Sequence, residues 1–296
     1  MPKVSVCIPA YNRPEVGETI ESVLTQTYRD FELIVIDDGS PDESTWEVIS
    51  SYGKPVRAFR QENAGIAGAK NACVAKAKGV LIAFCDHDDL WLPNKLERQV
   101  AMFEAQPEVG FVYCRYFLFT ADRGDFKIRP RKGLEGDIFK AMLLKIFVQT
   151  STAMIRRAVW EAAGPYDPSY IIADDYDFFL RVARVTPAAF VNETLVRYRL
   201  HPENTSRAEQ APERYNEEIL RIYQSWLARD DLSQVERRIV SRRIGKYYYN
   251  LAQIARKLGK TEHCCTMLAN ARQFDPYRIR YIKLAAGEWI RRSLGP

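Results

Sequence analysis

The sequence predicts an α/β fold, in which a mostly parallel sheet is flanked by helices and followed by a small all-α C-terminal region. Two observations predict the sheet. Short apolar runs alternate with segments of helical spacing along the first two thirds of the chain, and polar clusters stand where the apolar runs end. A third observation predicts the C-terminal region, because the apolar spacing from about residue 212 onward is helical.

The individual elements follow from the same patterns. Residues 4–8 are rich in β-branched side chains and end at Pro9, which is typical of a buried parallel strand, and residues 14–26 have helical spacing. Further strands are expected at residues 31–36, 56–60, 80–85, 109–120 and 190–198. Further helices are expected from residue 42, at residues 69–77, 94–105 and 137–146, from residue 158, and at residues 174–185. Residues 121–136 are charged and contain several glycines, so we expect a loop there.

The C-terminal region contains one recognisable unit. Residues 249–276 form two amphipathic segments around Gly259 and resemble a single tetratricopeptide-type helical hairpin. One hairpin is too short to form a solenoid, so packing of these helices on the main domain is an equally good interpretation. We therefore expect an α/β domain at residues 1–206 and a helical region at residues 207–296.

Charge is divided unevenly along the 296 residues, whose formal net charge is +5. Residues 205–296 contain 18 basic and 10 acidic residues, a balance of +8, which leaves −3 for the rest of the chain. This division argues against a chain-wide nucleic-acid surface, and we expect no nucleic-acid partner. The basic tail could rest on anionic lipid, hold an acidic acceptor or simply be a solvated helix face.

Cysteine spacing and hydropathy bear on the compartment. Six cysteines occur without a CxxC pair, which argues against a zinc site and suits a reducing cytosol. We find no signal-peptide pattern and no run of about 18 apolar residues. We therefore expect a cytoplasmic protein, located at the inner face of the cell membrane if the tail binds lipid.

Polar clusters follow three of the expected strands, at residues 9–12, 37–40 and 86–89. The carboxyl ends of parallel strands lie at one edge of a sheet, where open α/β proteins bind their ligands. Neither GxGxxG nor GxxxxGK[ST] follows the first strand, which argues against a dinucleotide-dependent dehydrogenase and a P-loop ATPase.

The acidic run Asp86-His87-Asp88-Asp89 indicates a cation site. On an extended backbone, alternation would turn the carboxylates of Asp86 and Asp88 to the same side. Carboxylate oxygens suit a hard cation such as Mg²⁺ or Mn²⁺ that also binds diphosphate oxygens. The alternative is a surface turn in which Asp89 caps the next helix.

Five segments of residues 3–206 carry a family resemblance, namely VSVCIPAYNR, ELIVIDDGSPD, ENAGIAGAKNACVAKAKGVLIAFCDHDD, AMIRRAVWEAAGPYDP and DDYDFFLR. In their order and spacing, these segments resemble the family 2 glycosyltransferases. The resemblance implies the GT-A fold and transfer of a sugar from a nucleotide donor to an acceptor hydroxyl, with inversion and usually with Mn²⁺ or Mg²⁺. It also implies a UDP- or dTDP-sugar donor, a glycan or glycolipid acceptor, and a setting in bacterial polysaccharide or glycolipid synthesis.

The resemblance implies roles for individual residues. Tyr11 would stack on the nucleobase, although it could instead serve helix entry, and Asp38 would accept the imide N–H of uracil or thymine. Lys70 stands where the family usually has arginine, so it could neutralise a phosphate without the bidentate contact. The donor-binding residues expected from the resemblance are Pro9, Tyr11, Asp38, Lys70, Asp86 and His87.

The metal and the catalytic base complete the site that the resemblance implies. Asp88 would coordinate the metal and His201 would complete its shell, while Asp86 would bind the donor ribose or the metal. Asp175 would be the catalytic base, and Asp174 replaces the family's usual glutamate. Without the resemblance, Asp174 and Asp175 would be interpreted as first-turn helix acids.

Two other functions compete with this hypothesis. A sugar nucleotidyltransferase would need a glycine-rich activation loop after the first strand, and PAYNRPE offers none. The other alternative is a catalytically inactive scaffold whose helical tail binds proteins. The presence of the complete set of Asp86, Asp88, Asp175 and His201 argues against such a scaffold.

Overall fold

The computed structural model describes residues 1–120, 122–130, 132–201, 211–276, 278 and 281. The chain divides into two compact units, one formed by Met1–Met142 and Ile146–Asn204 and the other by Leu143–Lys145 and Thr205–Pro296. The expected boundary at residue 206 lies outside the described residues and stays a prediction.

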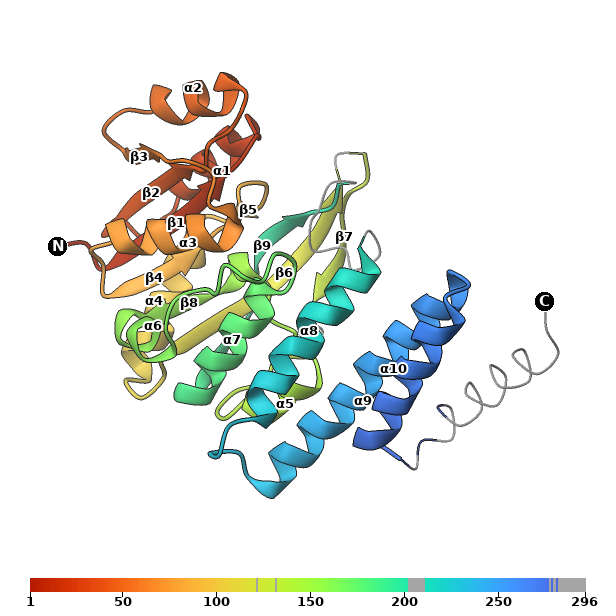
Figure 1. Ribbon diagram of the computed structural model, residues 1–296. Coiled ribbons are helices and arrows are strands. Elements are labelled where there is room, and N and C mark those ends of the chain that lie inside the picture. Colours follow the sequence, from red (N-terminus) through yellow and green to blue (C-terminus); the bar gives the residue numbers. More distant parts are fainter. Residues whose placement is uncertain (121, 131, 202–210, 277, 279–280, 282–296) are drawn as a thin grey trace. The chain divides into compact units, whose positions relative to one another are not determined.

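The described part of the first unit contains one nine-stranded sheet (Figure 1). Its strands are β1 (Val4–Ala10), β2 (Phe31–Asp37), β3 (Val56–Arg60), β4 (Leu81–Phe84), β5 (Leu90–Trp91), β6 (Phe111–Thr120), β7 (Gly124–Arg129), β8 (Met154–Arg156) and β9 (Ala188–Arg199). Their order is β3-β2-β1-β4-β8-β6-β9-β5, with β7 paired to β6. The helices that begin in this unit are α1 (Val16–Leu24), α2 (Glu43–Ser51), α3 (Gly65–Lys76), α4 (Lys95–Ala105), α5 (Phe139–Leu144), α6 (Arg157–Ala163) and α7 (Asp174–Val185), and the last residues of α5 belong to the second unit. The predicted α/β class is therefore confirmed.

The sheet is parallel where the strand-helix alternation is regular and mixed beyond it. Strands β3, β2, β1 and β4 are parallel to one another, whereas β8 is antiparallel to both β4 and β6. The expected loop at residues 121–136 is wrong for Gly124–Arg129, which pair with β6 as an antiparallel strand. This strand is polar and largely exposed, so it lacks the buried apolar run by which the other strands are recognised.

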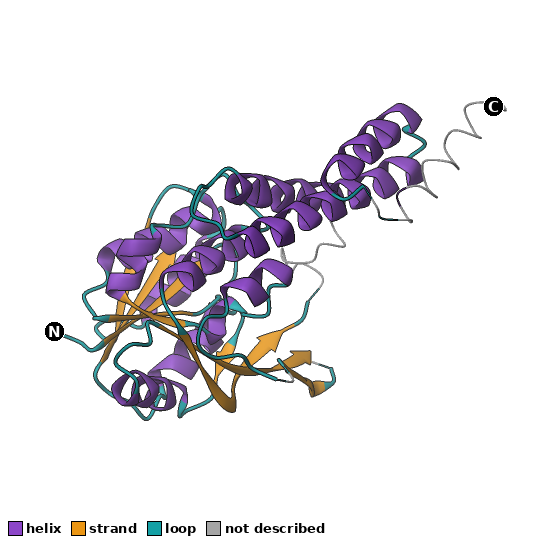
Figure 2. Cartoon of the chain, turned by 90° about the horizontal axis from the view of Figure 1, so that it is seen from below, coloured by secondary structure: helices purple, strands orange, loops and turns teal. Residues whose placement is uncertain are grey.

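Helices cover both faces of the sheet (Figure 2). The side chains of β1 alternate between the two faces, and all of them are buried. Val4, Val6 and Ile8 belong to one apolar core with side chains of α1, α2 and α4. On the other face, Cys7 contacts Cys73 of α3. Burial on both faces explains why β1 is a continuous apolar run in the sequence.

Gly79 sets the distance between β4 and β1 at the start of both strands. Its amide donates a 2.8 Å hydrogen bond to the Ser5 hydroxyl, which in turn donates to the Glu32 carboxylate at 2.6 Å. A Cβ at residue 79 would lie 2.6 Å from the Ser5 amide nitrogen. Glycine therefore lets β4 begin in register with β1.

The second unit is helical in its described part, as predicted. It contains α8 (Pro212–Leu227), α9 (Gln234–Lys257) and α10 (Thr261–Phe274). Ser233 and Glu236 form a capping box at the start of α9, and Gly259, with a φ of 72°, turns the chain between α9 and α10. Ala252, Ala255, Cys264 and Leu268 pack between these two helices, so the predicted hairpin around Gly259 is present.

Among the described residues, no helix has both the length and the apolar character needed to span a bilayer.

Gly79→Ala should separate β4 from β1, because the added methyl group has no room beside the Ser5 backbone. We expect the free energy of unfolding to fall by about 1–3 kcal/mol, measured by urea denaturation. Val80→Ala is the control, because the Val80 side chain is 53% exposed, and it should change the value by less than about 0.5 kcal/mol. Equal stability of the two variants would contradict the close approach of the strands.

Candidate active site

The site begins where β1, β2 and β4 end, since these parallel strands finish at the same edge of the sheet. The Asp38 amide donates to the Ala10 carbonyl at 2.8 Å, and the Asn12 amide donates to the Ser40 hydroxyl at 2.7 Å. The polar clusters after β1 and β2 are thus hydrogen-bonded to each other. The predicted convergence of these segments is present in the structure.

The two acids after β2 have different environments. Asp38 is buried, and its Oδ1 accepts hydrogen bonds from Gln61 Nε2 at 2.6 Å and from the Ala64 amide at 2.9 Å. Asp37 accepts from the Ser40 amide at 3.1 Å and lies 2.9 Å from Arg60 Nε. Asp37 therefore supports the turn, whereas Asp38 lies directly after β2, at the carboxyl edge of the sheet.

Three of the expected donor-binding residues, Tyr11, Pro9 and His87, also lie at this edge. Tyr11 follows β1 directly and is 45% exposed, so its ring is open to a ligand. The Pro9 carbonyl lies 3.2 Å from His87 Nδ1, and the Thr19 hydroxyl donates to the His87 carbonyl at 2.9 Å. His87 thus joins the end of β1 to the acidic run that follows β4.

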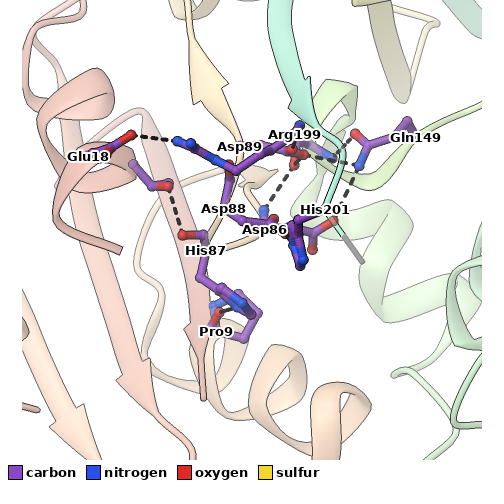
Figure 3. Close-up of polar contacts among 11 residues, drawn as sticks. Pro9, Glu18, Asp86, His87, Asp88, Asp89, Gln149, Arg199 and His201 are labelled. Atoms are coloured by element: carbon purple, nitrogen blue, oxygen red, sulfur yellow. Dashed lines mark hydrogen bonds and ion pairs between the residues drawn. The ribbon is translucent and has the colours of Figure 1, made fainter. Parts of the chain in front are cut away.

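The acidic run after β4 forms a turn (Figure 3). The Asp89 amide donates to the Asp86 carbonyl at 3.2 Å, so the backbone is not extended and the expected alternation of side chains is wrong here. Asp86 and Asp88 nevertheless stay close in space. Burial raises the pKa of Asp86, and the charge of Asp88 raises it further against the opposing effect of Lys70.

His201 meets this turn from a distant part of the chain. Its Nε2 lies 2.8 Å from Asp88 Oδ2, although 113 residues separate the two. Strand β9, which ends at Arg199, brings His201 to the turn. The structure thus brings together the two residues that the family resemblance assigns to the metal.

Asp89 is a residue whose place the sequence did not predict. The suggested helix cap is wrong, because α4 begins only at Lys95, after Asn94. Asp89 is instead fully buried and accepts hydrogen bonds from Ser151 Oγ at 2.5 Å, Gln149 Nε2 at 3.1 Å and the Arg199 amide at 3.0 Å. The local sign of its burial was the apolar pair at residues 90–91 directly after it, in which Trp91 is buried and Leu90 half-buried.

Lys70 lies inside the site rather than on its surface. Its side chain is 2% exposed, and its Nζ donates to Asp174 Oδ2 at 2.9 Å and lies 4.8 Å from the centre of the Tyr166 ring. Burial lowers the pKa of Lys70, but the charges of Asp174, Asp86 and Asp175 outweigh it and raise the pKa overall. Lys70 is therefore a buried cation among acids, and its expected contact with a phosphate stays a prediction.

Asp175 lies in the first turn of α7, half-buried beside the Lys70–Asp174 pair. Burial and the charge of Asp174 raise its pKa to about 7, against the lowering effect of Lys70. An ordinary aspartate loses its proton near pH 4, so Asp175 is distinguished by titrating near neutrality.

The residues present fit a divalent cation that is shared with a ligand. No group of three metal-ligating side chains occurs within the described ranges, so they form no all-protein cage. Asp88 and His201 nevertheless supply a carboxylate and an imidazole in contact, and Asp86 Oδ1 is buried without a hydrogen-bond partner among the described residues. Mg²⁺-type sites commonly combine one or two carboxylates with oxygens of a substrate phosphate.

The parallel strands of this open α/β sheet end in polar side chains at one edge. This arrangement defines the class of α/β proteins that bind their ligands at the carboxyl ends of the strands. Within this class, the chain belongs to glycosyl transferase family 2, whose sequence pattern matches residues 5–163. The recognition from the five segments is therefore confirmed.

Individual relatives agree with this membership. An uncharacterised glycosyltransferase of Rickettsia typhi is 32% identical over 211 residues, which are 69% of this chain and 66% of the relative. The Escherichia coli protein WfaP, named as a UDP-Glc:α-D-GlcNAc-diphosphoundecaprenol β-1,3-glucosyltransferase, is 33% identical over 213 residues, which are 70% of this chain and 80% of WfaP. The chain spans only 33% to 66% of the length of five rickettsial relatives.

Solved structures share the fold. Staphylococcus aureus TarS has a TM-score of 0.68 at 18% identity, covering 94% of this chain and 50% of TarS. The mannosyltransferase PcManGT of Pyrobaculum calidifontis, solved with GDP-Man and Mn²⁺, has a TM-score of 0.63 at 19% identity, covering 97% of this chain and 84% of that chain. The predicted GT-A fold is confirmed.

Lys70→Met should destabilise the protein, because it leaves Asp174 buried without its counter-charge. We expect a loss of roughly 3–5 kcal/mol in the free energy of unfolding at pH 8, measured by urea denaturation. Lys70→Met/Asp174→Leu, which removes both charges, should recover most of this loss. Lys78→Met replaces an exposed lysine and should have little effect. A Lys70→Met protein as stable as Lys78→Met would refute the buried pair.

Proposed function

We propose that this chain is an inverting glycosyltransferase that moves a sugar from a UDP- or dTDP-sugar to an acceptor hydroxyl, with Asp175 as the catalytic base. The observation that carries the proposal is the place of Asp175, half-buried in the first turn of α7 beside the Lys70–Asp174 pair, where burial and the charge of Asp174 raise its pKa to about 7. A base with a pKa near the working pH combines the deprotonated form with a useful proton affinity. Family membership supplies the class of reaction.

The reaction is a single displacement. The acceptor oxygen attacks the anomeric carbon from the face opposite the diphosphate, and the Asp175 carboxylate takes the hydroxyl proton. The bond between the anomeric carbon and the diphosphate oxygen breaks, and the nucleoside diphosphate leaves with the electron pair. One new bond on the opposite face replaces the old bond, so the configuration inverts.

The metal site in this proposal consists of Asp88 and His201, with Asp86 beside them. They would hold Mn²⁺ or Mg²⁺, which supplies positive charge to the departing diphosphate. The contact between Asp88 and His201 and the unpartnered Oδ1 of Asp86 support the assignment. The presence of Mn²⁺ in the PcManGT structure agrees with it.

The donor is assigned to the edge formed by β1, β2 and β4. Tyr11 stacks on the base and Asp38 accepts its imide N–H, while Pro9 and His87 line the approach to Asp86. The exposed ring of Tyr11 and the buried, hydrogen-bonded carboxylate of Asp38 suit these roles. TarS has been solved with UDP and with UDP-GlcNAc, which agrees with a uridine donor.

The acceptor we propose is a lipid-linked glycan of cell-surface polysaccharide synthesis, which would bring the enzyme to the inner face of the membrane. WfaP and a second Escherichia coli relative, WfgD, are both named as glucosyltransferases that act on α-D-GlcNAc-diphosphoundecaprenol. Helix α9 of this chain has seven basic residues and one acidic residue, and its Arg238 and Arg242 are exposed one turn apart. Each basic side chain near an anionic membrane contributes about 1 kcal/mol to binding.

Asp175→Asn should abolish the base while leaving the donor site intact. A thermal-shift screen of UDP- and dTDP-sugars with Mn²⁺ selects the donor, and UDP or dTDP release in the presence of a GlcNAc-diphospholipid measures transfer. We expect kcat to fall by roughly 10²–10⁴-fold with donor binding unchanged.

In the native chain, kcat/KM should rise with pH through about 7, because the carboxyl must lose its proton to act as base.

Asp167→Asn is the matched control, because Asp167 is exposed. This variant should keep the kcat of transfer and the pH dependence of kcat/KM of the native chain. Full transfer by Asp175→Asn would exclude Asp175 as the base.

Reversal of the exposed charge on α9 should weaken membrane contact. Native protein should sediment with phosphatidylglycerol vesicles at low salt and much less at high salt, because salt screens the attraction. Arg238→Glu/Arg242→Glu should bind less. Lys54→Glu/Lys78→Glu makes the same change in net charge on exposed residues of the first unit and should bind like the native chain. Absence of binding by the native protein at low salt would exclude this contact.

A further inference from the structure

We propose that Asp89 is a positioning residue whose buried carboxylate assembles the cation site from three separate segments of the chain. The inference rests on the proposed function, because it assumes that Asp88 and His201 hold a metal. It concerns a residue that contacts neither metal nor donor in the proposal and acts through its neighbours.

The carboxylate of Asp89 joins two distant segments to its own turn. Oδ2 accepts from Ser151 Oγ at 2.5 Å and from Gln149 Nε2 at 3.1 Å, and these residues lie 62 and 60 positions away. Oδ1 accepts at 3.0 Å from the amide of Arg199, which is 110 positions away. Both oxygens are therefore engaged, and the residue is fully buried. This arrangement suits a structural link better than a ligand contact.

The Arg199 link determines where His201 lies (Figure 3). The Arg199 amide is held by Asp89, and Arg199 Nε donates to the Asp88 carbonyl at 2.9 Å. Arg199 Nη2 also donates to Glu18 Oε2 of α1 at 2.5 Å. Strand β9 is thus fastened to the turn two residues before His201, whose Nε2 lies 2.8 Å from Asp88 Oδ2.

The Ser151 and Gln149 links determine where Asp86 lies. Ser151 Oγ donates to Asp89 and accepts from the Asp86 amide at 2.9 Å, so one hydroxyl connects both residues. Gln149 Nε2 likewise lies 3.3 Å from Asp86 Oδ2 and 3.1 Å from Asp89 Oδ2. Removal of the Asp89 acceptor would release the groups that orient Asp86.

Two acceptor oxygens are needed at this position because each of the three partners is a donor. A hydroxyl, an amide nitrogen and a backbone N–H all point at Asp89. Asparagine has the same shape but replaces one acceptor oxygen with an NH₂ group, which would face one of these donors. Asp89→Asn therefore tests the links with little change in volume.

The experiment measures Mn²⁺ binding to protein saturated with UDP, with free Mn²⁺ followed by electron paramagnetic resonance. Asp89→Asn should raise the half-saturating Mn²⁺ concentration roughly 10–100-fold, the size of effect that residues supporting metal ligands have elsewhere. Ser151→Ala, which removes the shared hydroxyl, should shift it in the same direction. Ser151→Ala alone decides the outcome if Asp89→Asn does not fold.

Glu32→Gln is the matched control. The Glu32 carboxylate also accepts from a serine hydroxyl, a backbone amide and an arginine, namely Ser5 Oγ at 2.6 Å, the Lys78 amide at 2.6 Å and Arg57. Glu32 lies near the beginning of β2, whereas the site lies at the carboxyl ends of the strands. We expect its Mn²⁺ affinity to equal that of the native chain.

Two outcomes would overturn the inference while leaving the proposed function intact. The first is a Mn²⁺ affinity in folded Asp89→Asn that equals that of the native chain; if Asp89→Asn does not fold, the same result in Ser151→Ala counts instead. The second is a loss of Mn²⁺ affinity in Glu32→Gln as large as the loss in Asp89→Asn or Ser151→Ala. Failure of the native, UDP-saturated chain to bind Mn²⁺ would overturn the proposed metal site together with this inference.

Discussion

The burial of several carboxylates at one edge of the sheet is the constraint on which the rest of the structure depends. Asp86, Asp174 and Asp175 act on one another electrostatically, and Lys70 is the buried cation that the described residues place among them. Burial raises the pKa of Asp175 to about 7 together with the charge of Asp174, because the single ammonium of Lys70 does not neutralise three acids. The same excess of negative charge suits a cation that arrives with a diphosphate.

The α/β topology creates this concentration of charge. Parallel strands end at one edge, so short polar segments after β1, β2 and β4 become neighbours although they are far apart in sequence. Strand β9 and helix α7 then add His201 and the acids of residues 174–175. A rigid sheet thus fixes the side chains, and the hydrogen bonds of Asp89 fasten β9 to the turn after β4.

Local patterns and the family resemblance predicted the parts of the site that lie within single segments. The apolar runs located β1, β2 and β4, and DDYDFFLR located the start of α7. The folding of the acidic run into a turn and the burial of Lys70 and Asp89 were not predicted. These features depend on partners 60 to 110 residues away, such as Gln149, Asp174 and Arg199, and local sequence does not reveal such partners. Strand β7 was missed because its polar residues pair with β6 without forming an apolar run.

If the acids hold a nucleotide diphosphate through a metal, nucleotide binding depends on a divalent cation, whereas an inactive scaffold would show no such dependence. Calorimetric titration of the native chain with UDP, in Mn²⁺ and again in EDTA, measures that dependence. The excess of buried acids over the Lys70 ammonium predicts saturable binding of one UDP per chain in Mn²⁺. It predicts much weaker binding in EDTA, because the acids would then repel the diphosphate. Equal affinity in the two buffers, or no binding in either, would contradict the view that these acids hold a nucleotide diphosphate through a metal.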